Sequence, residues 1–256
     1  VLGLGETMRF MECCEGEKRM ADKLELFAKK HIDGHAPGIR GKEVQAYRLA
    51  GVENDHECST AEEVLDKLRA GLHIYVREGS GAKNLETLIK TMLDAGVCLD
   101  RCAFCTDDKH VEEIRKEGHI STCIRKAIAL GVPVAKAYKM GSYQAAEFYG
   151  LKNYGAIGAG YRADIVFLDD LEQVRPLDVM KDGRILTEED YAKDYSVPVP
   201  DELLHTVHVG EVTKEKIRLS CDGKTDVIQM NPHQIVTTHL VAVSYTHLTL
   251  PTNSLV

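Results

Sequence analysis

The sequence predicts an α/β fold, the last five strands of a (β/α)8 TIM barrel followed by a small β domain, on three observations. Five extended runs each end near a polar or turn residue, at Glu6, His35, His56, Gly79 and Asp107. Successive ends lie roughly 20 to 30 residues apart, and every gap contains one helical pattern. This alternation is typical of parallel strands joined by helices, and polar residues at the carboxyl ends of such strands mark the chemically active end.

Helix boundaries are marked along the first 150 residues. Thr60 and Glu63 form a capping box at the start of one helix. The clearest amphipathic pattern begins at Leu85, repeats at Leu88 and Met92, and stops at Gly96. In chain order, the expected strands are residues 1–8, the runs into 33–35 and 55–57, 72–76 and 101–105, and the expected helices are 18–30, 44–50, 60–70, 85–95, 120–128 and 133–149.

The pattern changes after residue 150. Residues 155–169 read as a Gly-punctuated strand pair, and residues 179–186 as a hairpin around an Asp-Gly turn. Prolines 198 and 200 mark a linker, further strands are expected within 215–241, and no acidic or basic residue follows Ser244. We therefore expect three regions: the C-terminal part of a barrel over residues 1–150, a small β region over 151–241, and an unstructured or extraneous tail over 242–256.

Composition restricts the possible partners. A formal net charge of -8 with interspersed acids and bases disfavours nucleic acid, and no apolar run is long enough for a bilayer. The eight cysteines lack the spacing of a secreted scaffold, which favours free thiols in the cytoplasm. Because the chain begins inside an apolar run and only five strands are found, we expect the missing barrel strands to precede Val1.

One cysteine spacing suggests another chemistry. Cys98, Cys102 and Cys105 give C-x3-C-x2-C, which resembles the iron–sulfur motif of radical enzymes that use S-adenosylmethionine. Residues three apart on a strand face opposite sides, so Cys102 and Cys105 cannot share a cluster if residues 101–105 form a strand. We expect packed core thiols instead.

Histidines and acids recur at two of the strand ends. Residues 33–35 read Asp-Gly-His, and residues 55–57 read Asp-His-Glu. Parallel strands bring both histidines, His35 and His56, to one pocket, where imidazole and carboxylate together suit Zn, Fe or Mn. The alternative is that each histidine is structural and lies at the start of a helix.

These residues resemble the metal-dependent amidohydrolase superfamily, and within it the branch that deaminates adenine. The resemblance covers nearly all of residues 1–241, and the order and spacing of its short runs make it specific. The runs are residues 5–8, 33–38, 41–42 with 46–47, 55–58, 77–80 with 82–84, 105–108 and 117–120, and residues 155–169 resemble the small β domain.

The resemblance implies a centre of two divalent metal ions, Mn, Fe or Zn. It assigns the bridging carboxylate to Glu6, two histidine ligands to His35 and His56, and the last aspartate ligand to Asp107. The family also uses an H-x-H pair, and no such pair occurs in this sequence. We therefore expect at most one bound ion and negligible turnover for the 256-residue chain by itself.

The activity implied is hydrolysis of adenine to hypoxanthine and ammonia in purine salvage. Asp107 would act as base and then acid, while Glu57 would protonate the ring or orient the purine. Ser80 and His119 would contact the edge of the base. Each has a simpler explanation: Glu57 as a favourable charge at a helix start, Ser80 as a turn residue and His119 as a helix cap.

Two other functions stay open. One is a ring-opening amidohydrolase of the dihydroorotase or hydantoinase kind, against which stands Glu6, where those relatives carry a lysine. The other is a catalytically inactive partial barrel with open sheet edges. The sequence does not determine which metal is bound. It also leaves the oligomeric state open, and a homo-oligomer is one of the options.

Overall fold

The computed structural model describes residues 2–193, 196–218 and 223–243. Its contacts divide the chain into two compact units. The first contains residues 1–186 with 232–236, and the second contains residues 187–231 with 237–256. The first unit carries the parallel strands and all of the expected site residues.

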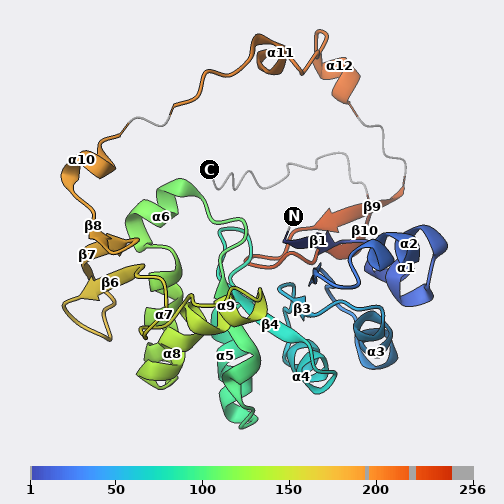
Figure 1. Cartoon of the computed structure of the whole chain (residues 1–256). Coiled ribbons are helices and arrows are strands. Elements are labelled where there is room, and N and C mark those ends of the chain that lie inside the picture. Colours follow the sequence, from blue (N-terminus) through green and yellow to red (C-terminus); the bar gives the residue numbers. More distant parts are fainter. Residues whose placement is uncertain (1, 194–195, 219–222, 244–256) are drawn as a thin grey trace. The chain divides into compact units, whose positions relative to one another are not determined.

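Five short strands of the first unit run parallel to one another (Figure 1). A hydrogen bond of 3.2 Å from the Glu53 amide to the Ile32 carbonyl links the two parallel groups that they form. The backbones approach closely here, since a Cβ added to Gly34 would lie 1.9 Å from the Asn54 carbonyl oxygen. The strands are β1 (Gly3–Thr7), β2 (His31–Gly34), β3 (Asn54–Asp55), β4 (His73–Arg77) and β5 (Cys102–Cys105).

Helices connect successive strands, as the alternating pattern predicts. The capping box is confirmed, because the Thr60 hydroxyl accepts from the Glu63 amide and the Glu63 carboxylate accepts from the Thr60 amide. The expected helix over 133–149 is interrupted at Ser142, whose φ and ψ of -142° and -80° lie outside the helical region. The helices are α1 (Phe10–Glu15), α2 (Lys18–Leu26), α3 (Gly41–Leu49), α4 (Ala61–Arg69), α5 (Leu85–Asp94), the 3-10 turn Leu99–Arg101, α6 (Val111–Glu117), α7 (Ile120–Ala129), α8 (Val134–Gly141) and α9 (Tyr143–Phe148).

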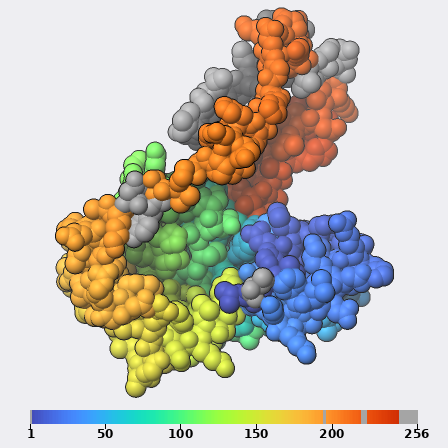
Figure 2. All heavy atoms as spheres, turned by 45° about the horizontal axis from the view of Figure 1, so that its top comes forward, coloured from blue at the N-terminus to red at the C-terminus, as the bar shows by residue number. Residues whose placement is uncertain are grey.

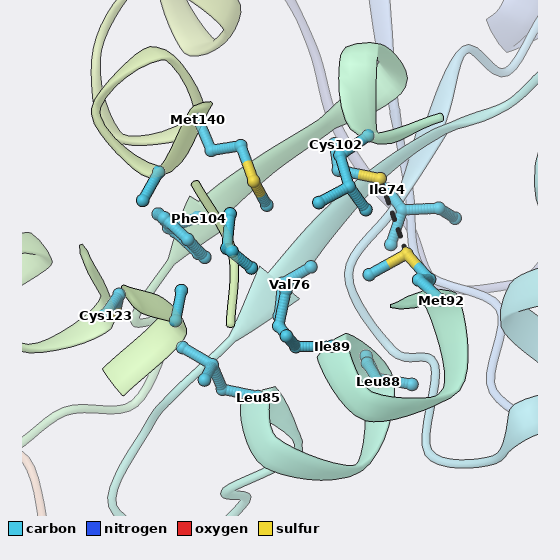
Figure 3. Close-up of a cluster of buried hydrophobic side chains, with 14 of the residues drawn as sticks. Ile74, Val76, Leu85, Leu88, Ile89, Met92, Cys102, Phe104, Cys123 and Met140 are labelled. Atoms are coloured by element: carbon cyan, nitrogen blue, oxygen red, sulfur yellow. Dashed lines mark hydrogen bonds between the residues drawn. The ribbon is translucent and has the colours of Figure 1, made fainter. Parts of the chain in front are cut away.

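The main apolar core lies between β4 and β5 and the helices that cover one face of them (Figure 3). Ile74 and Val76 of β4 point into this core together with the apolar face of α5. Cys102 packs there as well, with its sulfur 3.6 Å from the sulfur of Met92. The apolar spacing of residues 85–93 therefore reflects a buried helix face, as predicted.

The opposite face of β4 and β5 is covered by α9. Tyr75 and Ala103 pack here against Phe148, and the ring centroids of His73 and Phe148 are 3.7 Å apart. Tyr149 reaches further, and its hydroxyl lies 3.2 Å from the Asp33 carboxylate on β2. We call this the inner face of the sheet, because it bears the side chains that alternate with the core residues of Figure 3.

A small antiparallel sheet completes the first unit, formed by β6 (Ile165–Leu168), β7 (Pro176–Lys181) and β8 (Arg184–Ile185). The Asp-Gly hairpin is confirmed, with φ of 51° at Asp182 and 78° at Gly183. The strand pair expected over residues 155–169 is wrong, since only β6 is extended and the glycine-rich part before it forms turns. In Figure 2 this glycine-rich stretch forms part of the yellow surface of the first unit.

The second unit has less regular structure among its described residues. It contains the short helices α10 (Glu188–Tyr191), α11 (Asp201–Leu204) and α12 (Lys214–Ile217), and the antiparallel pair β9 (Lys224–Gln229) and β10 (Thr238–Val243). β10 includes residues 242 and 243, which were expected in the tail, whereas 244–256 fall outside the described residues. The domain boundary near residue 151 stays a prediction. No helix in the described parts could cross a membrane.

Candidate metal centre

Glu6, His35 and His56 come together at the carboxyl ends of three strands. Glu6 lies in β1, His35 directly follows β2, and His56 directly follows β3. One ligand atom from each lies within 4.8 Å of the other two, and no further group of three or more possible ligands occurs among the described residues. Because the strands are parallel, residues at their carboxyl ends meet at the same edge.

The geometry within this group fits a cation. Nδ1 of His35 lies 3.3 Å from Oε2 of Glu6, and Nε2 of His56 lies 3.6 Å from Oε1 of the same carboxylate. Both nitrogen atoms are buried and lack a hydrogen bond of regular geometry, although Nε2 of His56 lies 3.1 Å and Nδ1 of His35 3.7 Å from Oε1 of Glu57. The two imidazole rings stand edge to face, with centroids 5.4 Å apart. Buried polar atoms normally have well-aligned partners, so two buried imidazole nitrogens that face carboxylate oxygens without regular hydrogen bonds suit a divalent ion that Glu6, His35 and His56 would coordinate.

Tyr47 of α3 connects the first two ligand-bearing strands. Its hydroxyl accepts a hydrogen bond of 3.0 Å from the His35 amide and donates one of 3.1 Å to the Thr7 carbonyl. Thr7 directly follows Glu6 in the sequence, and Tyr47 is fully buried. The helix between β2 and the next strand therefore fixes the backbone beside Glu6 and His35.

Arg77 joins the two expected catalytic carboxylates. It ends β4, and Nη2 lies 3.3 Å from Oε2 of Glu57 while Nη1 lies 3.1 Å from Oδ2 of Asp107. Asp107 has a φ of 51°, in the left-handed region that few residues other than glycine adopt. Asp107 is not among the three clustered ligands. The structure thus brings Asp107 to the site through Arg77.

The electrostatics of Glu57 and His56 follow from these contacts. Burial by itself would raise the pKa of Glu57, but the His56 imidazole, 3.1 Å away, and the charge of Arg77 outweigh it and bring the pKa below its ordinary value. Burial would lower the pKa of His56, but the neighbouring carboxylates Glu57, Asp55 and Glu6 raise it above its ordinary value. Glu57 is therefore an ionised acceptor at neutral pH.

Two cavities adjoin the site, and Glu6 and Asp107 line both of them. The smaller, of about 160 Å³, extends over the inner face past His56 and Tyr75. The larger, of about 420 Å³, is lined by His35, Glu57 and Arg77 among others. Each of the four expected metal ligands therefore lines at least one of these two cavities.

Ser80 and His119 do not belong to the group of three ligands. The Ser80 hydroxyl donates to the Glu113 carboxylate at 2.6 Å and accepts from the His110 amide at 2.9 Å. His119 precedes α7, and its Nε2 lies 2.8 Å from the Thr106 hydroxyl. Neither residue lines the two cavities. Their contact with the edge of a base stays a prediction, and both are occupied here with local contacts.

The cysteine spacing does not make a cluster site. Cys102 lies in the apolar core, whereas Cys105 faces α9 on the inner side of the sheet. Burial raises the pKa of the Cys102 thiol to about 12 and that of Cys105 well above its ordinary value. The prediction that these two thiols point to opposite faces is confirmed.

Two functional contacts were missed from the sequence, those of Arg77 and those of Lys67. A signal existed for each. Arg77 follows four largely apolar residues, which places a charge at the end of a buried strand, and Lys67 comes three residues after Val64 on the apolar side of its helix. Charged residues in such positions are rarely buried unless they are paired.

The chain belongs to the Amidohydrolase family, whose model matches residues 16–186. Among curated proteins it is similar to "Adenine deaminase" of Desulfitobacterium hafniense, with 40% identity over 241 residues, 94% of this chain and 42% of that protein. A protein of the same name from Clostridium acetobutylicum is 42% identical over 231 residues, 89% of this chain and 40% of that protein. The chain thus spans about two fifths of the length of these relatives.

Solved structures support the fold. The structure of a beta-aspartyl dipeptidase from Fervidobacterium islandicum matches with a TM-score of 0.55 and 17% identity, over 77% of this chain and 61% of that one. An N-acetyl-D-glucosamine-6-phosphate deacetylase from Mycobacterium smegmatis matches with a TM-score of 0.51 and 16% identity, over 65% of this chain and 51% of that one. At these identities the matches indicate a shared α/β architecture.

Proposed function

We propose that this chain contributes to the active site of an adenine deaminase that acts in cytoplasmic purine salvage. Residues 1–150 would form the last five strands of a (β/α)8 barrel, and residues 151–241 a small β region. Parallel β1 to β5, the antiparallel sheet after them and the similarity to curated adenine deaminases support this proposal. Seven free cysteines among the described residues are in keeping with a reducing compartment.

The observation that carries the proposal is the group of Glu6, His35 and His56. Two buried imidazole nitrogens without hydrogen bonds of regular geometry face the Glu6 carboxylate, with Glu57 beside them, and imidazole and carboxylate form the donor set that Zn, Fe or Mn would take. Glu6, His35, His56 and Asp107 are the residues that would hold the two divalent ions of the proposed centre. When bound, such ions lower the pKa of a water molecule and orient it.

The chain's own carboxylates have distinct proposed tasks. Asp107 takes a proton from the water as its oxygen attacks C6 of adenine, and returns a proton to the exocyclic nitrogen, which leaves as ammonia. Glu57 is ionised and held by Arg77, so it is suited to accept a hydrogen bond from the purine and orient it. Of the two tasks expected for Glu57, its lowered pKa favours orientation over protonation of the ring.

Metal binding by the purified 256-residue chain is the first test. Titration calorimetry with Mn²⁺ should give about one ion per chain, since only one donor group is present among the described residues. His35→Ala and His56→Ala should each weaken binding by at least about tenfold, because each removes one ligand from the centre. His239→Ala is the matched control, an exposed histidine of β10 paired with Asp226. Equal affinity in all of these proteins would refute the assigned centre.

Activity is tested by complementation. The chain is co-expressed with the part of the Desulfitobacterium hafniense relative that it does not match, and ammonia release from adenine is measured. We expect release from the mixture, negligible release from the chain by itself, and a loss of at least about 100-fold with Asp107→Asn. Equal release with Asp107→Asn would refute the proton-transfer role.

A further inference from the structure

Lys67 of α4 is a fully buried charge. Its side chain is 0% exposed, and it extends from the helix toward the carboxyl ends of β2 and β3. Nζ donates a hydrogen bond of 2.7 Å to the Ala36 carbonyl and one of 2.9 Å to Oδ2 of Asp55, which is also 0% exposed. Lys67 thus contacts the backbone that directly follows His35.

The Asp55 carboxylate distributes its hydrogen bonds over both strand ends. Oδ1 accepts from the Ala36 amide at 2.7 Å, and Oδ2 accepts from the Glu57 amide at 3.1 Å. Ala36 directly follows His35, and Glu57 directly follows His56. One side chain therefore fixes the backbone after each of the two histidines.

Glu63, one turn before Lys67 on the same helix, extends this network. Its carboxylate accepts from the Gly38 amide, and from the Ser59 and Thr60 amides at 3.0 and 2.9 Å. The loops that leave both strand ends are therefore held by consecutive turns of α4.

Stability by itself does not account for such a pair. Removing two charges from water costs several kcal/mol per ion, and apolar residues of similar volume often serve as well or better. Hydrogen bonds behind metal ligands orient them, however, and losing one typically costs about 10- to 100-fold in metal affinity. Asp55 and Lys67 bond the backbone that directly follows the two candidate histidine ligands, and this position fits the second role.

We propose that the buried Asp55–Lys67 pair is a positioning device that sets His35 and His56 in ligand geometry before a divalent ion binds. The inference rests on the proposed metal centre. Asp55 and Lys67 do not themselves touch the ion; they act through the backbone of residues 36 and 57. The two histidines are thus oriented in part by α4, a helix that contributes no ligand.

The test uses the double variant Asp55→Asn/Lys67→Met, which removes both charges and leaves neither one buried without a partner. Its Mn²⁺ affinity by calorimetry should fall about 10- to 100-fold, while its circular dichroism spectrum stays that of the parent. The matched control is Lys109→Met/Glu117→Gln. It removes another buried lysine from an ion pair of 2.9 Å that does not contact β2 or β3, and its affinity should stay within about twofold of the parent.

A double variant with parent-like affinity would overturn the positioning role. Hydrogen exchange of the unmodified chain decides the question even if the variant fails to fold. Peptides covering residues 36–38 and 55–58 should exchange slowly without metal and change little when Mn²⁺ is added, because the network exists beforehand. Fast exchange that slows only with Mn²⁺ would contradict the inference. If the parent chain binds no Mn²⁺, the proposed metal centre is refuted. Slow exchange without metal would then mean that the Asp55–Lys67 pair has a structural role only.

Discussion

The guanidinium of Arg77 and the carboxylate of Glu57 form an ion pair that is almost fully buried, each side chain being 2% exposed. The pair links the end of β4 to the residue after His56. Arg77 also contacts Asp107, so a single side chain spans three strand ends. The two carboxylates with proposed catalytic tasks are thereby held at fixed positions by one cation.

Replacing Arg77 by methionine should therefore be costly. Arg77→Met leaves Glu57 as a buried charge that has lost its principal cation, and we expect the free energy of unfolding to fall by about 3 to 5 kcal/mol. Urea denaturation measures this change. The control is Arg40→Met, which breaks the half-exposed pair with Asp66 and should cost about 1 kcal/mol or less. Similar losses in the two variants would show that burial of the Arg77 pair is energetically unimportant.

Substitutions at Asp107 test whether the backbone after β5 keeps its left-handed conformation. An alanine at this position must keep a φ of 51° without the local hydrogen bonding of aspartate, whereas glycine adopts such a φ freely. Both substitutions remove the contact with Arg77. We therefore expect Asp107→Gly to be more stable than Asp107→Ala by about 0.5 to 1 kcal/mol in urea denaturation. The reverse order would mean that the backbone at residue 107 relaxes to a negative φ.

His73 should make the free energy of unfolding depend on pH under acidic conditions. Burial, with the nearby charges of Arg101, His31 and Arg48, lowers its pKa to about 4 from an ordinary value of 6.5. The unfolded chain then binds more protons than the folded chain between those values, so stability is lost as the pH falls from about 6.5 to about 4. The free energy of unfolding should fall by about 2 kcal/mol through His73, because solvent screens the charge of a ring that is not completely buried.

His73→Leu separates this contribution from other titrating groups. The variant should lose less stability than the parent between pH 7 and pH 4, as followed by urea midpoints at each pH. His239→Leu, an exposed histidine, should keep the parent's pH dependence. An unchanged acid limb in His73→Leu would show that His73 titrates alike in the folded and unfolded chain.

The thiols should differ strongly in reactivity. Cys98 is exposed, whereas Cys102 is buried and its pKa is raised to about 12. Since the thiolate is the reactive form, iodoacetamide should label Cys98 within minutes and Cys102 only after urea is added. Peptide mass spectrometry assigns the labelled sites. Labelling of Cys102 in the native chain at the rate of Cys98 would contradict the packing in Figure 3.

The alternation of strands and helices was predictable because each element has its own local signal. Thr60 and Glu63 mark a helix start, and Asp182-Gly183 marks a hairpin, by contacts within a few residues. The turns of residues 155–164 were missed because glycine permits both extended and turn conformations, so the sequence pattern does not decide between them. The break at Ser142 was missed although Gly141 directly precedes it, because a single glycine within a helical pattern is often tolerated.

The candidate ligands could be found because strand-end positions follow from the same alternation, which places His35 and His56 at one edge. The contacts that hold these ligands in place could not be found from the sequence. Lys67 lies 12 residues from Asp55 and 31 from Ala36, and Arg77 lies 30 from Asp107, so these partners depend on how helices and strands pack. Such long-range contacts leave only an indirect trace in the sequence, a charged residue where an apolar one is expected.

The cover of the inner sheet face has a consequence for the order of synthesis. Phe148 and Tyr149 follow every parallel strand, and the Tyr149 hydroxyl reaches back 116 residues to Asp33. Of the helices that cover the opposite face, α5 emerges from the ribosome between β4 and β5, and α7 and α8 emerge before α9. A nascent chain halted at residue 142 would therefore have the helices of the opposite face but not α9, and would display the ring of Tyr75 to water and to chaperones.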